Sequence, residues 1–123
     1  MRVEAPSASF AGPLEPLLDR DAALSRAGGD LGLLREIASL FLDNYKQWLA
    51  EIRDAAARGD ASALERAAHS IKGSVANFGA RAAVEAAFGL ELLGRRRDLG
   101  EAAHALNSLE LALAALRPEL EAL

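Results

Sequence analysis

The chain has 123 residues, enough for one ordinary domain and too few for a catalytic domain joined to a regulatory one. It contains no cysteine, which excludes disulfide scaffolds, thiolate metal sites and cysteine nucleophiles. Its formal charge of −4 provides no basic excess for binding nucleic acid. No apolar run approaches the roughly 18 residues that span a bilayer, and the N-terminal residues lack the apolar segment of a signal peptide, so we expect a cytoplasmic protein.

The composition predicts an all-α fold. There are 28 alanines and 22 leucines, which favour helix, whereas valine, isoleucine and threonine together number only six. Hydrophobic residues make up 51% of the chain, so the helices have enough apolar side chains to bury a core.

The prolines divide the chain into two parts. Pro6, Pro13 and Pro16 lie in the first sixteen residues, and proline denies a helix both a donor and space. We therefore expect residues 1–16 to form a flexible N-terminal arm and residues 17–123 to form the folded domain.

A short helix and a long helix are predicted first. The short helix begins near Asp19 and ends at Gly28–Gly29, where residues without a Cβ can adopt the left-handed conformation. Asp30 then caps a helix that extends to Gly59. Its apolar residues recur every three or four positions and form one buried stripe: Leu34, Ile37, Ala38, Phe41, Tyr45, Trp48, Leu49, Ile52, Ala55 and Ala56.

The third predicted helix follows directly. Asp60 or Ser62 is its expected N-cap, and Gly79 is expected to end or bend it. Its apolar stripe consists of Leu64, Ala68, Ile71, Val75 and Phe78.

Two further helices complete the chain. A fourth is predicted over residues 80–93, with Gly94 as its stop and Arg95–Arg97 in the following turn. Asp98 is expected to cap the last helix, which Pro118 ends or kinks. The inward residues of these two helices are Ala83, Ala87, Leu90 and Leu93, and Ala102, Leu106, Leu109, Leu113 and Leu116.

The links between the four longer helices are only a few residues long. Short links make consecutive helices antiparallel neighbours. The predicted fold is an up-down-up-down antiparallel four-helix bundle with a short extra N-terminal helix.

Few residues are available for chemistry. The two histidines, His69 and His104, lie 35 residues apart without the carboxylate pattern of a zinc helix. Phosphate-binding glycine loops are missing from the sequence, as is a convincing set of nucleophile, base and orienting residue. We expect no metal or cofactor of the chain's own, so any reaction needs a partner.

His69 shares a helical face with a distinctive set of residues. It follows the buried position Ala68, which places it at the edge of the apolar stripe, and Lys72, Gly73 and Ala76 lie on the same face. A glycine inside a helix lowers its stability by about 1 kcal/mol relative to alanine, so the presence of Gly73 calls for an explanation. Taken singly, His69 fits a histidine at the edge of the buried face and Lys72 fits a solvated lysine. Gly73 fits a small residue that lets two helices cross closely, a packing concession between crossing helices. Together, they fit a phosphoryl acceptor: a nucleophilic imidazole, a cation and an open approach.

The segment Ala68–Ala80 resembles the signature of bacterial histidine-containing phosphotransfer domains, in the pattern A-H-x-hydrophobic-K-G-x5-G-A. The segments Arg26–Asp30 and Gly94–Leu99 resemble that family's entries into its long and last helices. The resemblance covers roughly residues 18–116.

The resemblance implies that His69 carries a phosphoryl group between receiver-domain aspartates in a multistep phosphorelay. Lys72 would stabilise the phosphoryl group, and Gly73 with Ala76 would let the receiver dock. Magnesium would belong to the receiver. Because Lys72 is expected on the exposed face, its loss should cost little stability. Many family members carry a polar side chain on the fourth helix near the histidine, and Glu91 is a candidate for it.

Other charged residues have simpler explanations. His104 lacks a lysine or glycine companion and fits a structural or exposed histidine. Arg95–Arg97 complement the dipole of the helix that they follow. Glu65, one turn before His69, fits a solvated carboxylate.

The preferred hypothesis is a phosphoryl carrier that depends on its partner for turnover, and two alternatives to it stay open. The competing hypothesis is a helical interaction module that binds a receiver or kinase without being phosphorylated. It also fits the phosphorylatable domain of a chemotaxis-type kinase. The expected partners of the carrier are receiver domains and a sensor or hybrid histidine kinase. We expect a monomer without autonomous kinase activity whose interfaces are near or below about 1,200 Å² in total, because a relay must release its partner.

Overall fold

A computed structural model describes residues 17–123, so the predicted arm lies outside the described residues. The described part contains five helices: α2 (Arg20–Arg26), α3 (Leu31–Arg58), α4 (Ala61–Ala76), α5 (Arg81–Arg95) and α6 (Ala102–Glu121). The all-α prediction is confirmed. None of these helices combines the length and apolarity needed to cross a bilayer.

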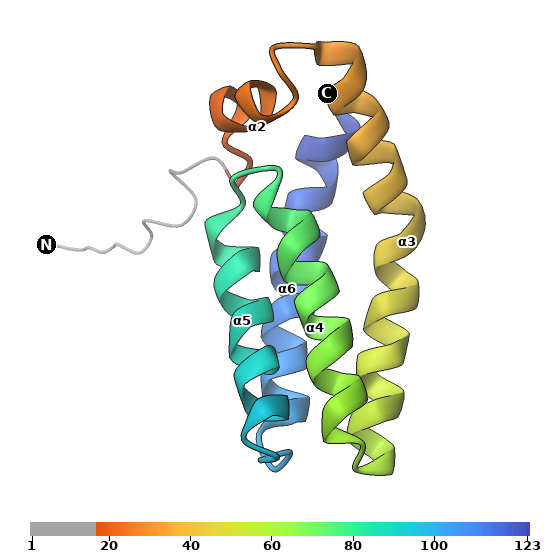
Figure 1. Ribbon diagram of the computed structural model, residues 1–123. Coiled ribbons are helices and arrows are strands. Elements are labelled where there is room, and N and C mark those ends of the chain that lie inside the picture. The colour runs from red at the N-terminus through yellow and green to blue at the C-terminus, as the bar shows by residue number, and fades with distance from the viewer. Residues whose placement is uncertain (1–16) are drawn as a thin grey trace, which may run out of the picture.

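Helices α3 to α6 run alternately up and down in one bundle, and α2 lies across its upper end (Figure 1). Helix α4 packs against α3 and α5, and α6 packs against the same two helices. Helices α4 and α6 therefore occupy diagonal corners. The predicted four-helix bundle with a short extra N-terminal helix is confirmed.

Aspartates begin three of the helices, as predicted. The side chains of Asp19, Asp30 and Asp60 each accept a hydrogen bond from a backbone N–H in the first turn of α2, α3 and α4. Gly59 ends α3 in the left-handed conformation with φ of 72°. These short-range interactions set the helix boundaries.

The prediction that Gly94 ends the fourth helix is wrong. Helix α5 continues through Gly94 to Arg95. A Cβ on Gly94 would lie 2.8 Å from the Glu65 backbone nitrogen and 2.9 Å from the Ala61 carbonyl oxygen, both on α4. Gly94 therefore permits a close crossing of α4 and α5 rather than a turn.

The last helix also differs from its prediction. Helix α6 begins at Ala102 after Glu101, so Asp98 is not its cap, and neither residue caps it through a side-chain hydrogen bond. The helix continues past Pro118 to Glu121. Burial of Leu116 and Leu120 in the core holds this last segment in place despite the proline.

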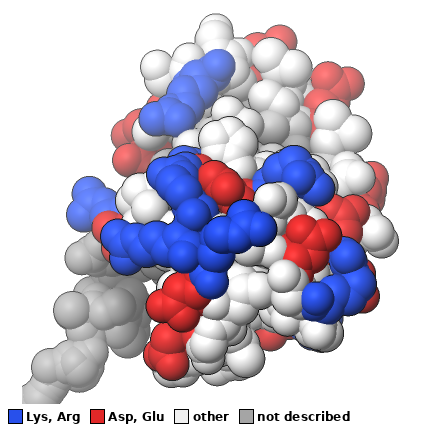
Figure 2. All heavy atoms as spheres, turned by 60° about the horizontal axis from the view of Figure 1, so that its bottom comes forward, with Lys and Arg blue, Asp and Glu red and all other residues white. Residues whose placement is uncertain are grey.

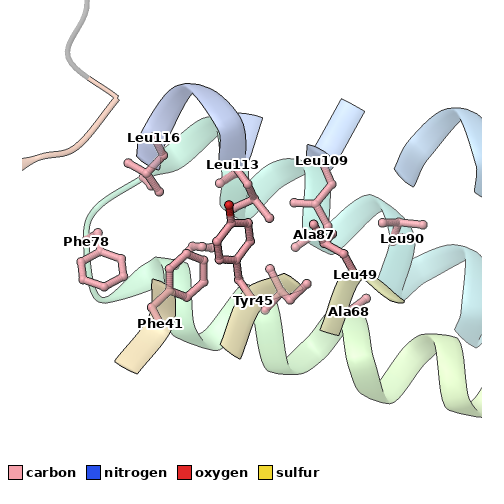
Figure 3. Packing of buried hydrophobic residues seen from close by; sticks show 14 of the residues in the cluster. Phe41, Tyr45, Leu49, Ala68, Phe78, Ala87, Leu90, Leu109, Leu113 and Leu116 are labelled. Carbon is pink, nitrogen blue, oxygen red and sulfur yellow. The ribbon is translucent and has the colours of Figure 1, made fainter. Parts of the chain in front are cut away.

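The core lies between the four long helices (Figure 3). Phe41 is central to its upper half, with its ring 5.3 Å from Tyr45 and 5.7 Å from Phe78, measured between centroids. Seven residues of the predicted α3 stripe are buried, while Ile37, Trp48 and Ala56 are partly buried at its edges. The fold thus provides a rigid support for the outer face of α4.

Candidate functional site

His69 projects from the middle of α4 into solvent. Its neighbours Ala68 and Ile71 are fully buried, and they fix the orientation of the helix. The His69 side chain is 66% exposed. The imidazole is therefore accessible to a partner, as the helical periodicity predicts.

A buried carboxylate lies beside the imidazole. Glu91 on α5 is only 3% exposed, and its Oε2 atom lies 3.2 Å from His69 Nδ1. A carboxylate only accepts, so in this contact Nδ1 carries the hydrogen and donates it. The other ring nitrogen, Nε2, then has its lone pair free to act as a nucleophile.

Lys72 approaches the other oxygen of the same carboxylate. Its Nζ atom lies 2.8 Å from Glu91 Oε1, an ion pair without the angles of a directed hydrogen bond. The ammonium also lies 5.0 Å from the centre of the Phe88 ring, within the range of a cation–π interaction. With 26% of its side chain exposed, Lys72 is held in place rather than freely solvated.

Arg95 completes the cluster from one turn further along α5. Its Nη2 atom donates to Glu91 Oε2 at 2.7 Å, and its Nε atom donates to Glu65 Oε2 at 3.1 Å. Glu65 therefore pairs with Arg95, and the Glu91 carboxylate is shared by His69, Lys72 and Arg95.

The partners of Glu91 keep it ionised in spite of its burial. Burial alone raises the pKa of a carboxyl group, but the close contacts with the Lys72 ammonium and the His69 ring outweigh this effect. The pKa of Glu91 is lowered from its ordinary value as a result. A fixed negative charge thus stands beside the imidazole at neutral pH.

Gly73 and Ala76 extend the open face of α4 above His69. A Cβ added at Gly73 would meet nothing within 4 Å, so this glycine is not a packing concession between crossing helices. Ala76 is partly buried, and its carbonyl accepts a hydrogen bond of 2.6 Å from Arg26 of α2. Gly73 and Ala76 thus add little bulk of their own to the face next to His69.

A family model described as Hpt domain matches residues 36–119, which is more than half of the chain. The chain belongs to the Hpt domain family. The predicted family is therefore confirmed, and this Hpt domain is a histidine phosphotransfer protein of a phosphorelay.

A solved structure supports the same assignment. The Hpt domain is similar to the crystal structure of histidine-containing phosphotransfer protein B from Pseudomonas aeruginosa PAO1, with 27% sequence identity and a TM-score of 0.79. The match covers 86% of this chain and 92% of that one. No curated protein matches the chain.

The sequence contains a signal for Glu91 that periodicity alone does not resolve. Glu91 follows the inward residue Ala87 by four positions, so it lies on the apolar stripe of the helix. Leu93 was expected to be buried, but in the Hpt domain it is only partly buried. Glu91 and Gly94 are buried instead. A charged residue on a buried stripe is a signal of function when cations can reach it.

His104 takes no part in this cluster. It is exposed on α6, diagonally across the bundle from α4. Of the two histidines, only His69 lies beside a lysine and a buried carboxylate.

We expect acid to remove the contribution of Glu91 to stability. Because its folded pKa is lowered, the ionised carboxylate stabilises the fold above the unfolded pKa of about 4.3, and this contribution is lost as pH falls through the folded pKa. The difference in unfolding free energy between the parent and Glu91→Gln should therefore be constant from about pH 7 to 5 and fall below about pH 4. Urea denaturation at each pH measures it.

Acid-sensitive groups that do not contact Glu91 cancel in that difference. The pKa of Asp60 is also lowered, mainly by the backbone N–H of Ala63, but Asp60 is present in both proteins. A difference that grows on acidification would show that burial dominates and that Glu91 is held protonated.

Proposed function

We propose that His69 accepts a phosphoryl group from the aspartate of one receiver domain and donates it to that of another. The observation that carries the proposal is the His69–Glu91 contact, in which an exposed imidazole donates its Nδ1 hydrogen to a buried carboxylate. This contact leaves Nε2 as the outward nucleophile.

The chemical step uses groups that already lie in position. The Nε2 lone pair attacks the phosphorus of an aspartyl phosphate, a P–N bond forms, and the P–O bond to the aspartate breaks. The aspartate leaves as a carboxylate, and the ring becomes positively charged while it keeps its Nδ1 hydrogen. The negative charge of Glu91 stabilises this cationic ring, and the reverse reaction delivers the phosphoryl group to the next aspartate.

Lys72 has a second role in this proposal. The arriving phosphoryl oxygens carry negative charge, and the Lys72 ammonium lies one helical turn from His69. Magnesium, which prefers carboxylate and phosphate oxygens, would be held by the receiver. We assign no autonomous kinase activity to the chain, so turnover depends on the partner.

The test is transfer of label from a phosphorylated receiver in the presence of magnesium. A carrier takes up label in an acid-labile and base-stable form, as expected of a phosphoramidate. An interaction module binds the receiver and takes up none. Labelling only by an ATP-bound kinase, and never by a receiver, would favour the domain of a chemotaxis-type kinase.

We expect Lys72→Ala to slow transfer roughly 10-fold to 100-fold, because the phosphoryl group loses a nearby cation while partial exposure limits the effect. The variant should still fold. However, removal of the ion pair to buried Glu91 should lower the unfolding free energy by about 1–3 kcal/mol, which is more than the small loss that the sequence predicts. Single-turnover transfer and urea denaturation measure the two effects.

Lys46 provides the control, since it is the only other lysine in the chain. It is exposed on α3, and Lys46→Ala should change neither quantity. Equal transfer rates for Lys72→Ala and the parent would remove Lys72 from the mechanism.

A further inference from the structure

Three consecutive arginines, Arg95–Arg97, lie at the turn between α5 and α6, at the lower end of the bundle in Figure 1. Figure 2 brings that end forward and shows a run of adjoining Lys and Arg atoms, with Asp and Glu atoms beside it and other Lys or Arg groups apart from it. The chain as a whole carries a net charge of −4. The three arginines therefore gather positive charge at this turn, although Asp98 and Glu101 follow them and the net charge of the chain is negative.

The backbone at this turn holds an arginine where glycine is favoured. Arg97 has φ of 58° and is the only residue other than glycine with positive φ in the described chain. The Arg97 N–H donates to the Gly94 carbonyl, and the Asp98 N–H donates to the Leu93 carbonyl, the two hydrogen bonds of a Schellman motif. In that motif the left-handed position is usually glycine, because a Cβ is strained there.

Interaction with the helix dipole does not account for Arg96 and Arg97. Arg95 already supplies a cation to the last turn of α5. Within residues 17–123, Arg96 and Arg97 lack a carboxylate partner within salt-bridge distance, and both are exposed. A side chain kept at a strained and unpaired position points to a contact outside the chain.

The turn lies close to the phosphoryl site. Arg95 Nη2 and His69 Nδ1 contact the same oxygen of Glu91, and Arg97 follows Arg95 by two residues, at most about 7 Å between Cα atoms. A transient interface of about 600 Å² on each partner is roughly 28 Å across. A receiver centred on His69 therefore has the α5–α6 turn at its rim.

We propose that Arg96 and Arg97 form a cationic rim that steers the acidic face of a receiver domain onto His69. This inference rests on the proposed function. A receiver must present an aspartate together with the oxygen ligands of a magnesium ion, so its reactive face is rich in carboxylates. Complementary charge at the rim raises the association rate without stabilising the complex for long, which suits a relay.

The double variant Arg96→Ala/Arg97→Gly tests this rim, with glycine chosen because it accepts a φ of 58° without strain. With a receiver that labels the parent, we expect kcat/KM for transfer to fall about 10-fold at low ionic strength. The rate at saturating receiver should not change, because Glu91 beside His69 is contacted by Arg95 and not by Arg96 or Arg97. The loss should disappear near 1 M salt, where the Debye length is only about 3 Å.

Two matched variants separate the rim from net charge and from the turn. Arg53→Ala/Arg117→Ala also removes two positive charges, but from exposed positions on α3 and α6. This variant should transfer like the parent. Arg96→Lys/Arg97→Lys keeps the charge and should retain most of the rate. Thermal unfolding of the glycine variant should occur at or above the parent's midpoint.

Several outcomes would overturn the inference. These are an unchanged kcat/KM in the glycine variant, an equal loss in the α3 and α6 variant, and a loss confined to the saturated rate. Unchanged transfer together with salt-sensitive binding to anionic phospholipid vesicles would assign the patch to a membrane surface. If the parent takes up no label from any receiver, the proposed function fails first and the rim fails with it.

Discussion

We expect a His69→Gln protein to fold normally and to take up no label from a phosphorylated receiver. The substitution removes the nucleophilic ring nitrogen but keeps a polar side chain whose amide can donate to Glu91. The side chain is 66% exposed and contributes little to the core, so the urea midpoint should stay close to that of the parent. Receiver binding, measured by calorimetry, should survive while labelling falls to background.

His104→Gln is the matched control for this loss. It makes the same replacement on α6, at an exposed position diagonally across the bundle, and it should be labelled like the parent. If His69→Gln still takes up label and His104→Gln does not, the phosphoryl acceptor is on α6, and the Glu91 cluster has another role.

The sequence alone predicts the helices well wherever their ends depend on nearby residues. Asp30 and Asp60 cap α3 and α4 through backbone groups three residues away, and Gly59 ends α3 through its own left-handed conformation. These interactions need no information from the rest of the fold. The apolar stripes are predicted for the same reason, because a helical period of 3.6 fixes which residues share a face.

Prediction of a helix end from the sequence fails for glycine, because a glycine can either end a helix or allow two helices to cross closely. In the sequence, Gly94 and Gly59 both follow an apolar helical stripe, but Gly59 ends its helix, whereas Gly94 lies within α5 where α4 and α5 cross. Only the distance between the two helices distinguishes these cases. The left-handed turn that Gly94 was expected to make is made by Arg97 instead.

Glu91 shows the same limit in the site. The sequence places a carboxylate on a helical stripe, but its partners His69 and Lys72 belong to the preceding helix. Their meeting depends on the close crossing at Gly94, which brings α5 against the backbone of α4. The resemblance to the Hpt family selects His69 and Lys72, and the packing of the bundle identifies the group that orients them.

Gly73→Leu should leave the fold at least as stable as the parent and reduce transfer about 100-fold. The glycine lies within α4, where leucine has the higher helix propensity, and an added Cβ meets nothing within 4 Å. The leucine side chain would nevertheless stand one helical turn from His69, on the face that a receiver must approach. In-line attack requires close positioning, and a displacement of about 1 Å can cost 100-fold in rate.

Gly89→Leu is the control that separates docking from helix propensity. An added Cβ at Gly89 also meets nothing within 4 Å, and Gly89 lies about 200° around α5 from both Glu91 and Ala87, on the outer face. Both leucine variants should therefore show an equal or higher urea midpoint, but only Gly73→Leu should lose single-turnover transfer and receiver affinity. Normal transfer by Gly73→Leu would mean that the receiver approaches His69 from the α5 side, across Phe88 and Arg95, rather than over Gly73 and Ala76.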